Sequence, residues 1–508
     1  MFHYNIKEYT KCFDNLYDTL KVSAEKRPDK VAVIDDSGSY TYSQLKIMVD
    51  NMANTLLKKY SMKKNEQIAF FMVNSIHMVV SFYATMKIGC VAVMLNTKFS
   101  SCEIEEYLKD MDAKLIISDS EWLDKFDKVP IAKKCRGIIT EKTNIDPMLS
   151  SEDIPANASA GDTAVIMHTS ATTGNPKGIL ITHANILEAS YGYVETQGID
   201  SSVISVLSAP IFHILGLSCV TTMIIYLGGT LVLTRKYKTD VVLKLIKEYK
   251  ATHFHSVPSI YLDIMHSDSP DKDLSSIKTL VCGGAHISDE DMIEFCKLAP
   301  NAVFRKAYGM TETAGSGTLS HTHCGPLEAV PNMHITVVDE ELNEVPTGTI
   351  GEIVFCGPCC ALGRWKMKSF DKPYIYSGDI GYMDEKGGVY IIDRKKDIIN
   401  RGGEKIFPKE IEDVILKYPG IEKAVVYAVS DKYYGEVPYS AIILKENACV
   451  DVNELNLFLK KYIAKYKMPV KFIVVNSFPT THNGKVKKRK LREYTEKGEI
   501  GIWENQNL

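Results

Sequence analysis

Short apolar runs alternate with amphipathic stretches through the first two thirds of the chain. The runs at 68–72, 91–95 and 115–118 have the length of buried strands, whereas 75–87 and 101–111 carry the three-to-four-residue spacing of helices. The same alternation predicts further strands at 203–208, 230–233, 278–282 and 302–304. Strands that alternate with helices favour mostly parallel sheets joined by crossover helices.

The pattern changes after residue 330. The apolar runs 334–338 and 351–355 lie close together with turn residues between them, which predicts an added antiparallel sheet or a small β-barrel. After a strand at 389–392, the charged run 393–397 indicates a domain boundary. The last part of the chain then predicts a compact α+β segment, with helices at 408–417 and 452–465 and strands near 424–429, 440–444 and 471–475.

These elements predict an α/β protein of two domains. The N-terminal domain, residues 1–394, would hold mostly parallel sheets with flanking helices and a small β-barrel-like subdomain. The C-terminal domain, residues 395–508, would be small and α+β.

One stretch, residues 201–234, contains no Asp, Glu, Lys or Arg and is long enough to cross a bilayer. Pro210, His213 and the pair Gly228-Gly229 interrupt it, whereas a membrane-spanning helix must satisfy its backbone without a break. We therefore expect a buried strand, loop, helix and strand. At most, the protein would contact a membrane peripherally.

Composition narrows the class of protein. The 508 residues are 45% hydrophobic and 24% charged with a formal net charge of −3, so nothing indicates a nucleic-acid partner. The 12 cysteines follow no disulfide framework and suit free thiols in a reducing compartment. The first residues show no basic segment followed by an apolar run. We expect a cytoplasmic protein, either monomer or homodimer.

The clearest chemical signal is the run from Thr169 to Gly178, which follows the apolar strand residues 164–167. Small hydroxyl residues and glycines after a strand let backbone N–H groups turn toward an anion, and Lys177 adds a mobile positive charge. The spacing is not that of a Walker loop. The run predicts a polyphosphate site, and the alternative is a polar surface loop.

Five further clusters follow in order: Pro210–Gly216, Tyr308–Glu312, Ser377–Asp379, Asp393–Asp397 and Pro479–Lys485. With the loop, this series resembles the adenylate-forming superfamily of acyl-CoA synthetases, luciferases and peptide-synthetase adenylation domains, over about Leu16 to Leu491. The resemblance implies an active site between a large N-terminal domain and a small mobile C-terminal domain. It also implies that ATP and Mg2+ activate a carboxylic acid to acyl-AMP, with release of pyrophosphate and transfer of the acyl group to CoA.

The resemblance assigns a nucleotide site residue by residue. The β- and γ-phosphates would be held by Thr169, Ser170, Ala171, Thr172, Thr173, Gly174 and Lys177. Adenine would lie against Gly283, Gly284, Ala285 and Tyr308. Thr311 would touch the α-phosphate, Glu312 would bind Mg2+, and Asp379 and Arg394 would bind the ribose hydroxyls. In isolation, Asp379 could equally cap a helix or turn after Gly378.

The resemblance also assigns the moving parts. Lys485 would bridge the carboxylate and the α-phosphate, Lys396 would be the hinge, and Gly402 and Gly403 would pass the thiol arm after a domain rotation. For Lys485, the alternative is a solvated lysine in a basic tail. For Gly402 and Gly403, the alternative is an ordinary turn.

His213 discriminates between substrate classes. Amino-acid-activating members place an Asp after the corresponding Phe, whereas Phe212 is followed here by His213, so a substrate ammonium would lack a counter-ion. In acyl-CoA synthetases a His here gates the passage between acyl pocket and thiol tunnel. The pocket segments are mostly small or apolar and favour an aliphatic or aryl acid; they are 212–218, 255–259, 283–287 and 307–315.

Several alternatives remain open at this point. The acyl group could go to a carrier-protein phosphopantetheine, the acid could be of the o-succinylbenzoate type, or the chain could be a non-enzymatic nucleotide-binding relative. A zinc site is a further alternative whose spacing fits no standard pattern; it would use His321, His323, Cys324, Cys356, Cys359 and Cys360.

Overall fold

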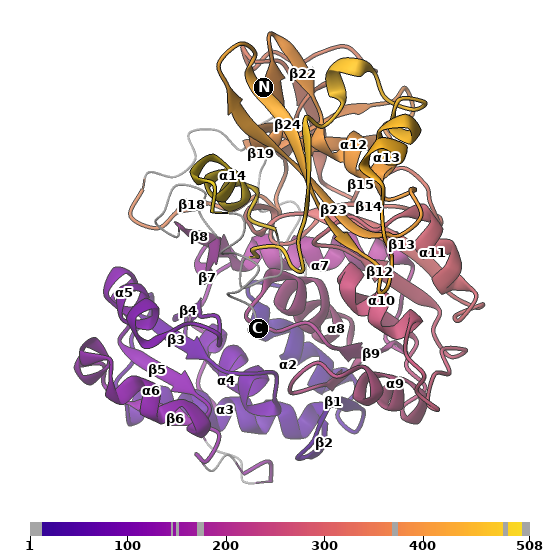
Figure 1. Cartoon of the computed structure of the whole chain (residues 1–508). Helices are drawn as coiled ribbons and strands as arrows, with labels where there is room; N and C mark the ends of the chain where they lie inside the picture. The colour runs from indigo at the N-terminus through magenta and orange to yellow at the C-terminus, as the bar shows by residue number, and fades with distance from the viewer. Residues whose placement is uncertain are drawn as a thin grey trace. The chain divides into compact units, whose positions relative to one another are not determined.

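The computed structural model describes residues 13–143, 146–148, 152–169, 177–367, 374–480 and 486–499. These residues form two compact units (Figure 1). The first unit runs to Ile335 and also includes Phe355–Ile375, and the second contains Thr336–Val354 and the chain from Tyr376 onward. The sequence-based boundary between residues 394 and 395 stays a prediction.

A nine-stranded sheet lies in the first unit. Its order is β15-β14-β13-β12-β11-β9-β10-β1-β2, and the run from β13 to β1 is parallel. The strands are β1 (Val31–Asp35), β2 (Gly38–Thr41), β9 (Ile204–Leu207), β10 (Thr230–Leu233), β11 (His253–Ser256), β12 (Thr279–Cys282), β13 (Val303–Gly309), β14 (Gly317–Leu319) and β15 (Glu328–Ala329).

A seven-stranded sheet in the same unit has the order β18-β8-β7-β4-β3-β5-β6. The run from β7 to β6 is parallel, and β8 returns antiparallel to β7. The strands are β3 (Gln67–Phe71), β4 (Val91–Met94), β5 (Leu115–Ser118), β6 (Ile138–Thr140), β7 (Thr163–Thr169), β8 (Lys177–Thr182) and β18 (Gly363–Arg364). The predicted phosphate loop therefore connects two paired strands.

Helices of the first unit begin where local sequence favours it. Capping boxes open three of them, at Thr41, Ser100 and Thr182. The apolar faces of α9, α10 and α11 pack with the nine-stranded sheet in one buried cluster. The helices are α2 (Leu16–Lys26), α3 (Tyr42–Lys58), α4 (Ile76–Lys87), α5 (Ser101–Met111), α6 (Leu123–Asp127), α7 (His183–Gln197), α8 (Met223–Leu227), α9 (Thr239–Glu248), α10 (Pro258–Met265) and α11 (Asp289–Cys296), with 3-10 turns η1 (Ser120–Trp122), η2 (Pro130–Lys134) and η4 (Thr311–Thr313).

The charge-free stretch forms a buried strand, loop, helix and strand, as predicted, but the helix begins as a π-helix. This segment, η3 (Leu215–Thr222), runs directly into α8. Two threonine hydroxyls donate to carbonyls of the wide turns: Thr221 Oγ1 to Gly216 O at 2.7 Å and Thr222 Oγ1 to Ser218 O at 3.1 Å. Periodicity did not reveal this, because nearly every η3 position is buried. Among the described helices, none is both long and apolar enough to cross a membrane.

The second unit contains a four-stranded sheet, β16-β17-β19-β20, and a C-terminal sheet, β22-β21-β24-β23 with β25 beside β24. Its strands are β16 (His334–Val338), β17 (Gly351–Cys356), β19 (Tyr374–Met383), β20 (Val389–Arg394), β21 (Ile399–Arg401), β22 (Glu404–Ile406), β23 (Ile421–Asp431), β24 (Gly435–Leu444) and β25 (Lys471–Val474). Of these, β16, β17 and β19 each have an end in the first unit. Its helical segments are α12 (Pro408–Ile415), α13 (Val452–Leu459) and α14 (Lys488–Lys497), with the turns η5 (Lys395–Asp397) and η6 (Lys465–Lys467).

The predicted helix over 452–465 was too long. The helix α13 ends at Leu459, and turns lead on to η6. Leu459 and Ile463 both pack into the same apolar core, so the apolar spacing continues beyond the point where the helix ends.

Candidate active site

The turn that carries His213 follows β9 and is held tightly by backbone contacts. The His213 N–H donates to Pro210 O at 3.1 Å, and His213 O accepts from Leu217 N–H at 2.9 Å. A Cβ atom at Gly216 would collide with the Pro210 carbonyl, so this position requires glycine. The turn and the start of η3 therefore form one compact unit around His213.

The predicted adenine residues follow β12 and β13, which are parallel neighbours in the nine-stranded sheet. Gly283 approaches the next strand closely, since a Cβ there would lie 3.3 Å from Ala307 Cβ, and Gly284 has φ of +80°. On β13 the Tyr308 ring lies at 5.4 Å from the Phe355 ring. The structure thus brings Gly283, Gly284 and Tyr308 to one end of the sheet, with Ala285 following directly in the chain.

Thr311 and Glu312 lie on the 3-10 turn η4, immediately after β13. Thr313 fixes this turn through its hydroxyl, which accepts from Met310 N–H at 3.1 Å. The Glu312 carbonyl accepts from Ala361 N–H at 2.7 Å. The backbone that carries the predicted Mg2+ ligand is therefore anchored from two sides.

The His213 and Glu312 segments pack against each other through Gly315. A Cβ atom at Gly315 would lie 3.0 Å from Ile214 Cγ1 and 2.7 Å from Cys219 Sγ. The Gly315 carbonyl accepts from Tyr193 OH at 3.0 Å and from Cys219 Sγ at 3.5 Å. Within the first unit, the structure therefore places the segment that carries His213 next to the segment that carries Thr311 and Glu312.

In the second unit, Asp379 and Arg394 face each other across β19 and β20. Arg394 Nε lies 2.6 Å from Asp379 Oδ1, and the Asp379 side chain is only 6% exposed against 47% for Arg394. The Asp379 N–H donates to Ser377 Oγ at 3.0 Å. A buried carboxylate beside a half-exposed guanidinium is suited to hydrogen bonding with a diol.

Lys396 lies on η5, between the two sheets of the second unit in the chain. Gly402 and Gly403 form the turn between β21 and β22 with φ of +60° and +96°, values that favour glycine. The Gly402 N–H donates to Tyr434 O at 2.8 Å, and the Arg401 guanidinium lies 4.6 Å from the Tyr434 ring. The turn is therefore held by contacts with Tyr434.

Several predicted residues lie outside the described residues, namely Ser170, Ala171, Thr172, Thr173, Gly174 and Lys485. The structure does describe residues on either side of 170–174 and of Lys485. Thr169 pairs with Lys177 at the ends of β7 and β8, and Thr480 pairs with Val486. The two segments are therefore flanked by paired backbone.

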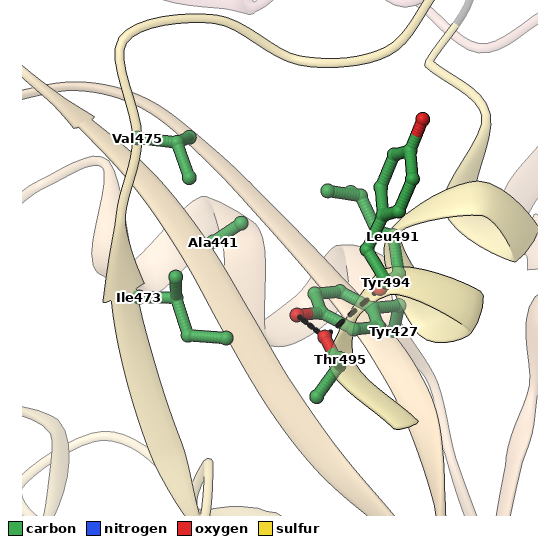
Figure 2. A pocket seen from close by; sticks show the side chains of 7 residues that line it. All are labelled: Tyr427, Ala441, Ile473, Val475, Leu491, Tyr494 and Thr495. Carbon is green, nitrogen blue, oxygen red and sulfur yellow. Dashed lines mark hydrogen bonds between the residues drawn. The ribbon is translucent and has the colours of Figure 1, made fainter. Parts of the chain in front are cut away.

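Helix α14, which follows Lys485, is docked on the C-terminal sheet. Figure 2 shows Leu491, Tyr494 and Thr495 of α14 close to Tyr427, with Ala441, Ile473 and Val475 on the opposite side. These seven residues line a gap of about 10 Å³. Such a gap holds at most about one water molecule. It is a packing defect rather than a substrate site. The Tyr427 hydroxyl and Thr495 Oγ1 lie 2.8 Å apart and fix the helix.

Strand β11 carries two buried histidines: His253, which sequence reasoning missed, and His255, which begins the predicted pocket segment 255–259. Burial lowers the pKa of His253 to about 4 and that of His255 to about 3, so both rings are neutral at pH 7. The ring centroids of His255 and Tyr193 lie 5.9 Å apart. No local pattern marks His253, because a buried histidine in a strand has no sequence signature of its own.

The zinc alternative gains no support. Within the described parts of the chain no group of three or more His, Cys, Asp or Glu side chains could hold a metal ion. His323 Nδ1 instead accepts from Phe304 N–H at 3.1 Å.

Comparison with known proteins identifies the family. The family model described as "AMP-binding enzyme" matches residues 20–365, and that of the "AMP-binding enzyme C-terminal domain" matches residues 410–485. The chain belongs to the AMP-binding enzyme family. The expectation from the ordered motifs is thereby confirmed, and so is the predicted α/β fold class.

Curated AMP-binding relatives match the chain over nearly its whole length. It is 31% identical to 2-succinylbenzoate–CoA ligase of Bacillus licheniformis, over 93% of this chain and 98% of that protein. It is 29% identical to long-chain-fatty-acid–CoA ligase of Bacillus subtilis, over 94% of each chain. Feruloyl-CoA synthase of Amycolatopsis is also 29% identical, over 92% of this chain and 96% of that protein.

Solved AMP-binding enzymes share the fold. ATP-bound MatB from Rhodopseudomonas palustris aligns with a TM-score of 0.87 at 26% identity, covering 96% of this chain and 100% of that one. o-Succinylbenzoate CoA synthetase from Bacillus subtilis, in complex with its acyl-adenylate intermediate, aligns with a TM-score of 0.83 at 27% identity, covering 94% of this chain and 98% of that one.

Proposed function

We propose that this chain is an AMP-forming acid–CoA ligase for a hydrophobic carboxylic acid. In the first step a carboxylate oxygen attacks the α-phosphate of ATP and pyrophosphate leaves, which gives acyl-AMP. In the second step the CoA thiol attacks the acyl carbon and AMP leaves, which gives acyl-CoA. The observation that carries the proposal is the match of both family domains and of full-length CoA ligases to this one chain.

The first step brings two anions together, so the residues around it must neutralise charge. The segment 169–178 would hold the β- and γ-phosphates, and Lys485 would bridge the carboxylate and the α-phosphate. Asp379 and Arg394, already paired at 2.6 Å, would bind the ribose hydroxyls. The order of the motifs along the chain supports these roles, and so does the geometry of the Asp379–Arg394 pair.

Glu312 is the residue that would hold Mg2+. A carboxylate on a short turn suits this hard cation, which takes its other ligands from phosphates and water. The anchored carbonyl of Glu312 fixes the backbone of that turn. Bound there, Mg2+ would neutralise charge on the phosphates during adenylation.

The segments around His213 favour an apolar acid. Phe212 and Ile211 are buried, and His213 is followed by Ile214 and η3. No aspartate stands beside Phe212 to pair with a substrate ammonium, which argues against an amino acid. An aryl acid of the o-succinylbenzoate type is the second candidate, because the 31% identical relative is a ligase for that acid.

Pyrophosphate release tests the proposal. Purified enzyme is given ATP, Mg2+ and one acid from a panel of fatty, hydroxycinnamic and succinylbenzoic acids, with and without CoA. We expect one class of acid to support release that CoA accelerates, with a thioester as product. Amino acids and the Lys485→Ala variant are the negative controls. Release without thioester formation would favour a carrier protein as acceptor, and inactivity with every acid would favour a non-enzymatic relative.

A further inference from the structure

A buried asparagine, Asn74, joins the carboxyl ends of two strands that belong to different sheets of the first unit. Asn74 follows β3 of the seven-stranded sheet, whereas Ala209 and Ile211 follow β9 of the nine-stranded sheet. The Asn74 Nδ2 donates to Ala209 O at 2.9 Å, and its Oδ1 accepts from Ile211 N–H at 2.8 Å. Both polar ends of a side chain that is 4% exposed are therefore bound to one short turn.

The backbone on either side of Asn74 is itself fixed. The Val73 N–H donates to Asp119 Oδ2 at 2.8 Å, and the Ile76 N–H donates to Asp35 Oδ2 at 2.7 Å. Ser75 caps α4 through Met78 N–H. The amide of Asn74 is thus presented from a backbone with little freedom to move.

The clamped turn leads directly to His213. Pro210, between the two residues that Asn74 holds, accepts from His213 N–H at 3.1 Å. The same carbonyl lies so close to Gly216 that no side chain fits there. A shift of the 209–211 turn would therefore move His213 and the first turn of η3 with it.

We propose that Asn74 is a positioning residue, which fixes the turn after β9 and thereby places His213 for transfer of the acyl group to CoA. The inference rests on the proposed acid–CoA ligase function. Asparagine suits this position because one planar amide both donates to a carbonyl and accepts from an N–H. Aspartate lacks the donor when ionised, and an apolar residue would leave a buried carbonyl and N–H unpaired.

A double-mutant cycle with His213→Ala tests the coupling. The variants are Asn74→Ala, which removes the amide, and Asn74→Leu, which removes both hydrogen bonds while keeping the same branched arrangement of heavy atoms. In single-turnover transfer from enzyme-bound acyl-AMP to CoA, we expect each Asn74 variant to lose roughly 10- to 100-fold, as small misplacements do. In the His213→Ala background we expect the further loss to be less than about threefold, because the residue that Asn74 positions is already absent.

Asn54→Ala is the matched control. Asn54 is also buried and its Nδ2 donates to two backbone carbonyls, Asp50 O at 3.1 Å and Glu152 O at 2.7 Å, but it holds α3 rather than the His213 turn. We expect it to lower the unfolding midpoint as the Asn74 variants do, with transfer unchanged.

The outcomes separate the two claims. Wild-type enzyme that forms no thioester contradicts the proposed function. Active wild-type enzyme whose Asn74 variants transfer normally, or lose activity by the same factor with and without His213, overturns the positioning role alone.

Discussion

At the scale of single residues, the Asp379–Arg394 pair makes the most direct prediction. Asp379→Asn keeps the shape but removes the charge that faces the guanidinium and the ribose. We expect the apparent affinity for ATP to weaken by about 1–3 kcal/mol, or roughly 5- to 150-fold. Isothermal titration with ATP and the KM for ATP would both measure this effect.

The control for Asp379 is Glu493→Gln, which neutralises a carboxylate paired with Arg489 Nε at 3.1 Å on the surface of α14. Surface pairs of this kind contribute about 0–1 kcal/mol. An equal change in ATP affinity for both variants would show that charge at Asp379 has no specific role.

Lys485 carries the second residue-scale prediction. Lys485→Ala should slow adenylate formation by about two orders of magnitude or more, as removal of a preorganised charge does. Lys487, two residues away and exposed, is the matched control, and Lys487→Ala should retain the wild-type rate. Pyrophosphate release in a stopped-flow assay distinguishes them. Similar losses in both variants would indicate a general effect of the basic tail.

At the scale of elements, Gly216 connects a loop to a helix. Gly216→Ala would drive a methyl group into the Pro210 carbonyl, so the turn or the π-helix must shift. We expect a loss of about 1–3 kcal/mol in unfolding free energy and a larger proportional loss of acyl transfer than of adenylation. Urea unfolding and the two partial reactions measure these effects. Thr222→Ser, at the C-terminal end of the same π-helix, keeps the hydroxyl and should change acyl transfer little. Equal losses in the two variants would contradict the special role of Gly216.

Most elements were predictable, and the exceptions have physical reasons. Strand β5 matches its predicted bounds because it is a short, continuous apolar run. Helix α5 matches because its hydrophobic periodicity and its capping residues indicate the same bounds. The π-helix η3 was missed because uniform burial removes the periodicity that would reveal its turns. Within the site, the motifs pointed to Asp379 and Glu312, but not to Asn74, since its two partners lie 135 and 137 residues away in the sequence.

At the scale of the whole molecule, buried neutral histidines couple stability to pH. His253 is fully buried in β11, with Ser205 Oγ at 2.8 Å from Nδ1 and Gln197 Oε1 at 3.0 Å from Nε2. Burial lowers the pKa of His253 to about 4, of His255 to about 3, and of His168 and His183 to about 4. The ordinary value near 6.5 returns on unfolding. These groups therefore favour unfolding in acid.

The sign and size of this coupling give the last prediction. Between about pH 6.5 and 4 the unfolded chain binds a proton at each of these histidines that the folded chain does not, so their contribution to stability falls as pH falls. Each contributes up to about 1.4 kcal/mol per pH unit to the slope of unfolding free energy against pH. His253→Gln should reduce that slope by up to about 1.4 kcal/mol per pH unit. Urea unfolding at a series of pH values would measure this change. Ser205→Ala breaks the same hydrogen bond but keeps the titrating ring, so it should lower stability and retain the slope. If His253→Gln left the slope unchanged, the ring would already be protonated or solvated in the folded enzyme, contrary to its complete burial.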